Sequence, residues 1–142
     1  MANQTLPTRV LLMCGAVVGP LYVTVTMAQA LTRDGFDLTQ HRFTLLTTGD
    51  LGWLHQANMV GVGVGTVLLA IGARQLLRTG RGAMWGPRLL GLLGIAYIVG
   101  GLLSADAVAG FPAGTTAEMV QTTVQGRVQN ASRGISTILL IA

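Results

Sequence analysis

Apolar residues occur along this chain in three long runs, separated by shorter segments that hold most of the charged residues. The runs cover residues 10–31, 53–77 and 89–109. A helix needs about 20 mostly apolar residues to cross the hydrocarbon core of a bilayer, and each run is long enough. The pattern therefore predicts an all-α fold, a polytopic transmembrane helix bundle that forms one membrane domain over residues 1–142.

A fourth apolar run covers only residues 135–142, after a polar stretch at residues 113–134. A helix of that length rises about 12 Å, which is less than half of the hydrocarbon core. We expect a partial fourth helix that docks on the other three without crossing. The alternative is that the chain is an incomplete product whose fourth helix continues elsewhere.

The segment between the first two runs, residues 32–52, mixes apolar and charged residues. Phe36, Leu38 and Phe43 alternate with polar neighbours, a pattern typical of a segment lying at the membrane interface. Asp50 lies three residues before the start of the second run. A carboxylate at a helix N-terminus is favourable, so we expect Asp50 to cap the second helix.

Composition supports a lipid environment. The chain is 51% hydrophobic and 10% charged, whereas soluble domains carry about 25% charged residues. All nine basic residues are arginines, and the net charge is +4. They lie at the ends of the apolar runs and not in a basic patch with aromatic residues, which argues against nucleic acid as a partner. The expected partner is the lipid bilayer.

Arginine placement also predicts an orientation. The loop between the second and third runs carries Arg78, Arg81 and Arg88 without an acidic residue. Cytoplasmic loops are enriched in such residues, so this loop and the N-terminus are expected in the cytoplasm, at a bacterial inner (plasma) membrane. The first run is longer than the apolar core of a signal peptide, which predicts an uncleaved helix despite the motif Ala28-Gln29-Ala30.

Small residues recur at helical spacing within the runs. Such spacing lets helix backbones approach closely in lipid. The sequence leaves open whether these residues pack within the chain or between two copies. The predicted helix-packing positions are Gly15, Gly19, Gly61, Gly65, Gly94 and Gly101. The glycines at 61 and 65 do not form a phosphate-binding loop, because no strand precedes them.

Four polar residues near the expected outer face could converge if the second and third helices are neighbours. They are Asp50, His55, Asn58 and Asp106. Ionisable groups inside a membrane are costly and often functional, so these residues are the candidates for a catalytic or ligand-binding site. The simpler interpretation is interfacial capping and ion pairing. His41 and His55 lack the spacing of a metal pair, and we expect no metal and no cofactor.

A resemblance rests on several segments that follow one another along the chain: residues 14–21, 29–38, 45–46, 49–53 with 56–58, 80–88, and Asp106 with residues 110–115. In this order they resemble the DUF998 family of uncharacterised bacterial integral membrane proteins. The resemblance implies a bundle of about six helices, of which this chain would hold the N-terminal half. It also implies histidines before the fourth helix, where this chain has Gln125 and Gln129.

The sequence supports three hypotheses for function. The first is a non-enzymatic membrane protein that works through helix packing, as a homo-oligomer or with the missing C-terminal half. The second is a membrane-embedded enzyme or small-molecule site at the outer leaflet. The third is a half-transporter that must dimerise, which the lack of a charge near mid-membrane disfavours. We expect the protein not to be an enzyme.

Overall fold

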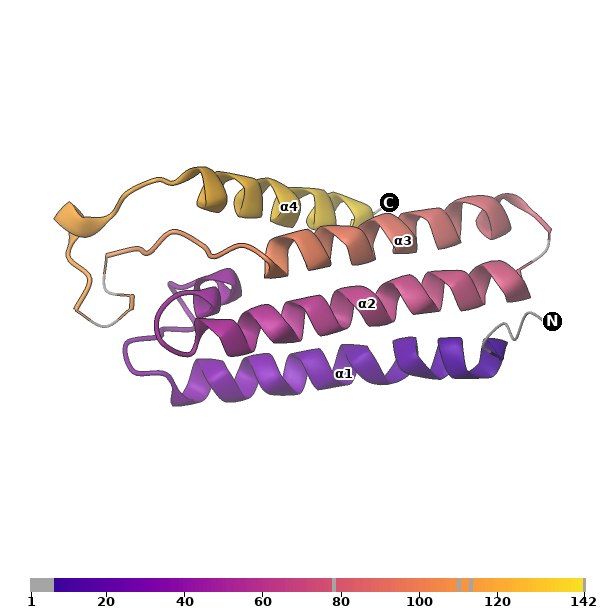
Figure 1. The fold of residues 1–142 in the computed structure, drawn as a ribbon, viewed down its shortest axis with the longest axis horizontal. Helices are drawn as coiled ribbons and strands as arrows, with labels where there is room; N and C mark the ends of the chain where they lie inside the picture. Colours follow the sequence, from indigo (N-terminus) through magenta and orange to yellow (C-terminus); the bar gives the residue numbers. More distant parts are fainter. Residues whose placement is uncertain (1–6, 78, 110, 113, 142) are drawn as a thin grey trace, which may run out of the picture.

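Four antiparallel helices lie side by side in chain order (Figure 1). The computed structural model describes residues 7–77, 79–109, 111–112 and 114–141. Its helices are α1 (Thr8–Thr32), α2 (Gly52–Leu76), α3 (Arg81–Gly101) and α4 (Val124–Ile141), with short 3₁₀ helices η1 (Phe43–Thr47) and η2 (Ala117–Met119). Each long helix packs on the next one along the chain. The predicted all-α fold is confirmed, and the described residues form no strand beyond an isolated bridge between Val108 and Phe111.

Three of these helices, α1, α2 and α3, are long and apolar enough to cross a membrane. The first two begin and end within two residues of the predicted runs. Helices α1 and α3 finish at one end of the bundle, and α2 and α4 begin there. We call this end the site end. The N-terminus of the described chain and the α2–α3 connection lie at the opposite end (Figure 1).

Helix α3 begins and ends eight residues earlier than the predicted run at 89–109. Pro87 suggested a loop, but it lies inside the helix, where it cannot donate a hydrogen bond to the carbonyl of Ala83. Arg74 on α2 supplies that bond, because its Nη1 donates to the Ala83 carbonyl oxygen at 3.1 Å. The proline is therefore accommodated by a side chain from the neighbouring helix.

The residues after Gly101 leave the helix because side chains from elsewhere bind them. The backbone N–H of Ala105 donates to Oγ1 of Thr47 in η1 at 2.8 Å. Gln56 on α2 donates through Nε2 to Oγ of Ser104 at 3.0 Å. Asp106 consequently lies in the loop that follows α3, and not within the last turn of a helix as predicted.

Helix α4 takes in residues 124–134, which we had predicted to be a polar stretch outside any helix. Its buried residues, Gly126, Gln129, Ser132 and Ser136, recur at intervals of three and four, so one polar face packs against α3. The helix begins beyond the end of α3 and finishes alongside it (Figure 1). It is not among the helices apolar enough to span a membrane, and residue 142 lies outside the described part.

The first loop folds over the site end of the bundle. Leu46 is 0% exposed and packs in a cluster with Ala30, Leu45 and Phe111. Arg33, which follows α1, donates from Nη1 to the carbonyl oxygens of Leu46 at 2.7 Å and Thr48 at 3.1 Å. These contacts fix the loop against the ends of the helices.

The predicted cap at Asp50 is absent from the start of α2. The residue before the helix is Leu51, and no side chain there accepts a capping hydrogen bond. The chain instead turns tightly into the helix at Gly52, where a Cβ atom would collide with the backbone carbonyl of Thr47. The backbone of η1 therefore leaves room only for glycine at the first residue of α2.

Four of the six predicted packing glycines lie where two helices touch. A Cβ on Gly15 would lie 2.5 Å from the Leu69 side chain, and one on Gly65 would lie 2.8 Å from Val18, so both positions bring α1 close to α2. Gly94 and Gly101 make similar approaches between α3 and α2. These four glycines therefore allow close packing between helices of the same chain.

Gly19 and Gly61 lie away from these contacts, since a Cβ on either would meet nothing within 4 Å. Their places are taken by glycines that the spacing did not single out. Gly63 faces α3, where its Cβ would lie 2.7 Å from the Gly94 carbonyl oxygen, and Gly72 faces Leu11 on α1.

Candidate functional site

His55 and Asn58, two of the four predicted site residues, lie in the contact between α1 and α2. Asn58 donates from Nδ2 to the carbonyl oxygen of Tyr22 and to Oγ1 of Thr26, both at 3.2 Å. The His55 side chain is 0% exposed, and its ring centroid lies 6.1 Å from that of Tyr22. Neither ring nitrogen of His55 has a hydrogen-bond partner among the described residues. Both side chains thus belong to the interior of the bundle.

Asp50 lies apart from these two residues, exposed on the first loop. It lines a shallow surface hollow together with Arg33 and Pro112. Burial lowers the pKa of the Arg33 guanidinium, and the nearby carboxylate of Asp50 acts in the opposite direction. Asp50 thus offsets part of the cost of burying the loop-fixing Arg33.

Asp106 joins the loop after α3 to the start of α4. Its Oδ2 accepts from the backbone N–H of Thr123 at 3.0 Å, and its Oδ1 accepts from the Thr123 hydroxyl at 2.6 Å. That hydroxyl oxygen in turn accepts from the N–H of Gly126 at 3.0 Å. The four predicted residues therefore do not converge on one site. Within the part of the chain that the structure describes, no group of three His, Cys, Asp or Glu could hold a metal ion.

Replacing Asp106 with alanine is expected to loosen α4 at a cost of about 1 kcal/mol, because two hydrogen bonds at the helix start are lost. Hydrogen exchange should become faster in residues 123–127 and remain unchanged in α1. The matched control is Asp50→Ala, which removes the same charge from an exposed position. Unchanged exchange in residues 123–127 of the Asp106 variant would contradict this structural role.

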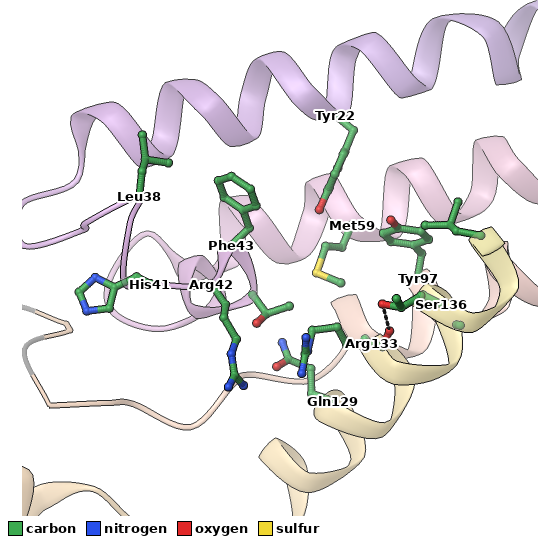
Figure 2. A pocket seen from close by; sticks show the side chains of 15 residues that line it. Tyr22, Leu38, His41, Arg42, Phe43, Met59, Tyr97, Gln129, Arg133 and Ser136 are labelled. Atoms are coloured by element: carbon green, nitrogen blue, oxygen red, sulfur yellow. Dashed lines mark hydrogen bonds between the residues drawn. The ribbon is translucent and has the colours of Figure 1, made fainter.

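A cavity of 380 Å³ with both polar and apolar walls lies at the site end. Helices α1, α2, α3 and α4 and the first loop all contribute to its walls (Figure 2). The lining residues are Tyr22, Leu38, His41, Arg42, Phe43, Thr44, Met59, Ala96, Tyr97, Gly100, Gln129, Arg133, Ser136, Thr137 and Leu140. We call this opening the bundle cavity.

One part of the bundle cavity is polar. Figure 2 shows Arg42 from the first loop together with Gln129 and Arg133 from α4. Gln129 is 1% exposed, and its Nε2 donates to Oγ1 of Thr47 at 3.2 Å and to the carbonyl oxygen of Leu103 at 3.3 Å. Its Oε1 is buried without a partner among the described residues. This part of the cavity thus offers two cations and one unused acceptor.

The other part of the bundle cavity is largely apolar. Leu38, Phe43 and Met59 line it, and Leu140 lies three turns further along α4 than Gln129. The rings of Tyr22 and Tyr97 meet edge to face with centroids 5.9 Å apart, and their hydroxyl groups are directed toward the cavity (Figure 2). The lining therefore combines charged and apolar side chains, since Leu38 and Phe43 lie on the same loop as Arg42.

A second cavity of 520 Å³ lies next to the first, and the two share His41, Arg42 and Thr44 as lining residues. Asp106 and Asn130 line this second, more polar cavity. The shared wall places Arg42 where it can reach either space.

The loop that carries Arg42 is held by a hydrogen-bonded turn. Nδ1 of His41 accepts from the backbone N–H of Asp37 at 2.9 Å. Hydrogen bonds from the hydroxyl and backbone N–H of Thr39 lower the pKa of the Asp37 carboxyl. The charged form of Asp37 thus favours this turn at neutral pH, and the contribution is lost as the pH falls through the lowered pKa.

Sequence reasoning did not identify the bundle cavity. The sequence pattern singles out neither Arg42 nor Arg133 as a site residue, and it marks Gln129 only as a departure from the family pattern. These three residues come together because the first loop folds back over the bundle and α4 packs on α3. No local spacing in the sequence signals that arrangement.

The comparisons with known proteins give one match. The model of a family described as "Protein of unknown function (DUF998)" matches residues 16–141. The chain belongs to the DUF998 family. The match confirms the resemblance drawn from the sequence motifs, and it extends through α4 to include every residue of the bundle cavity. No curated protein and no solved structure matches this DUF998 chain.

Proposed function

We propose that this DUF998 protein is an integral membrane protein that binds an amphipathic molecule in the bundle cavity. The observation that carries the proposal is that the wall of the cavity combines Arg42, Gln129 and Arg133 with apolar side chains. A molecule with a polar head and an apolar chain would match both parts. The volume of 380 Å³ falls within the range of about 300–1,000 Å³ that is usual for ligand pockets.

The location of the cavity supports a ligand drawn from the membrane. Three of the four helices around it are long and apolar enough to span a bilayer. Many of their large apolar side chains are exposed, such as Val17, Leu92 and Ile95, as expected for surfaces that contact lipid. An amphiphile in the bilayer would therefore meet the cavity without leaving the apolar phase.

The assembly hypothesis has less support. Gly15, Gly65, Gly94 and Gly101 were its main candidates for an interface between copies, and all four are occupied by contacts within the chain. An enzyme built on Asp50, His55, Asn58 and Asp106 is likewise weakened, because these side chains lie in three separate places. The half-transporter hypothesis has no specific observation in its favour.

A binding assay tests the proposal. A dansyl-labelled alkyl chain, in anionic and uncharged forms, should bind the purified protein saturably in detergent. Thr137→Trp should abolish that binding, since Thr137 lines the cavity and its hydroxyl bonds only to its own helix at Arg133. Ile138→Trp is the matched control, because Ile138 is 68% exposed and does not line the cavity. Equal binding by both variants would refute the proposal.

The orientation follows from the arginines, and we propose that the site end faces away from the cytoplasm. Cys14 is the one cysteine of the chain, so a Cys14→Ala background allows single cysteines to be placed at will. A membrane-impermeant maleimide should label Gln40→Cys in intact cells and Thr79→Cys only after permeabilisation. The reverse pattern would place the site end in the cytoplasm.

A further inference from the structure

We infer that the bundle cavity recognises the headgroup of an anionic phospholipid that also carries a hydrogen-bond donor beside its phosphate. The inference rests on the proposed function and adds the chemical class of the ligand. It is carried by two arginines from different elements and by the unused acceptor of a buried glutamine.

Arg42 and Arg133 provide the anion site. The first comes from the loop that precedes η1 and the second from α4, and both line the bundle cavity. Among the described residues, neither guanidinium makes a hydrogen bond or an ion pair; the arginine side chains that do donate are Arg33 and Arg74. Two like charges facing one space repel each other, and an anion between them would remove that cost.

Guanidinium groups suit the oxygens of a phosphate particularly well. Each presents a planar fork of N–H donors that can bind two oxygens at once. A phosphodiester in a lipid has two non-bridging oxygens that share one negative charge, so each arginine can bind one or both. The apolar lining beyond this point, from Met59 to Leu140, then accommodates the start of the acyl chains.

Gln129 indicates that the group attached to the phosphate carries a hydrogen-bond donor. The Gln129 side chain makes two hydrogen bonds, and Nε2 donates both of them. Its acceptor, Oε1, is buried without a partner among the described residues. An unsatisfied buried carbonyl is unfavourable. A phosphodiester has no donor to offer, and a hydroxyl or N–H on the group attached to it would supply one. A glycerol headgroup has this chemistry, whereas a choline headgroup has no N–H or O–H.

The test uses short-chain lipids that differ only in the headgroup, with binding to the full chain measured in neutral detergent. Phosphatidylglycerol has the anion and hydroxyls, phosphatidylmethanol has the anion without a hydroxyl, and phosphatidylcholine is neutral overall. We expect phosphatidylglycerol to bind roughly tenfold more tightly than phosphatidylcholine, with phosphatidylmethanol between them. The absence of a preference for phosphatidylglycerol over phosphatidylmethanol would overturn the role of Gln129.

Protein variants separate the anion site from general surface charge. Arg42→Gln combined with Arg133→Gln should lower the affinity for phosphatidylglycerol severalfold, toward that for phosphatidylcholine, and should leave its preference over phosphatidylmethanol in place. Arg127→Gln is the matched control, because Arg127 is an exposed arginine on the same helix that does not line the cavity. A thermal melt of each variant checks folding. Equal losses in the control and in the double variant would overturn the anion site.

Three further outcomes distinguish failure of this inference from failure of the proposed function. Inorganic phosphate at millimolar concentration should not displace phosphatidylglycerol; full displacement would mean that the site takes free phosphate and would refute a lipid ligand. Tight and equal binding of all three lipids would refute the headgroup class while leaving the amphiphile site intact. Binding of none of them would refute the proposed function itself.

Discussion

Replacing Gly63 with leucine is expected to destabilise the bundle by about 3 kcal/mol, the upper part of the usual range for overpacking. A Cβ at this position would lie 2.7 Å from the carbonyl oxygen of Gly94 and 2.8 Å from the backbone nitrogen of Ile98. Because both are backbone atoms of α3, the clash can be relieved only by moving a whole helix. Titration with a denaturing detergent, monitored by circular dichroism, measures the loss in the free energy of unfolding.

Gly61→Leu is the matched control for this effect. Gly61 lies two residues away on the same helix, is exposed, and has nothing within 4 Å of its Cβ position. The same added side chain should there change stability by less than about 0.5 kcal/mol. Equal destabilisation by the two variants would mean that α2 and α3 do not pack through Gly63.

Replacing Leu46 with alanine is expected to destabilise the site end by about 3 kcal/mol, since the change removes a buried side chain and leaves a cavity. Leu46 is 0% exposed and packs with Ala30, Leu45 and Phe111. Hydrogen exchange should become much faster across residues 33–51. Because the same loop carries Arg42, the affinity for an anionic amphiphile should fall as well.

Leu51→Ala is the control for the loop prediction, because Leu51 is 51% exposed at the end of the same loop. It should leave both hydrogen exchange and ligand affinity close to those of the parent. If Leu46→Ala were to loosen the loop without weakening binding, Arg42 could not be the residue that holds the headgroup.

The sequence predicts the helices well because a bilayer imposes a minimum length on any apolar span. The starts of α1 and α2 follow directly from that constraint. The position of α3 does not, because Pro87 is compatible with a helix only when Arg74 of another helix supplies the missing hydrogen bond. The extent of α4 was also missed, since its buried face consists of polar and small residues that do not form an apolar run.

The site was harder to predict for a related reason. Asp50, His55, Asn58 and Asp106 lie at the same end of the bundle, as the order of the runs indicates, but the rotation of each helix decides which side chains meet. His55 and Asn58 turn toward α1, and Asp106 is drawn to Thr123. The same uncertainty about rotation explains why the spacing favoured Gly61 where the structure uses Gly63.

The most direct test of the amphiphile site is native mass spectrometry of the protein extracted from its own membrane in mild detergent. We expect one lipid mass to remain on the parent chain and on Ile138→Trp, and to be missing from Thr137→Trp. Identification of that mass would also report the headgroup. An adduct that persists in the Thr137 variant, or a parent chain that carries none, would contradict the amphiphile site.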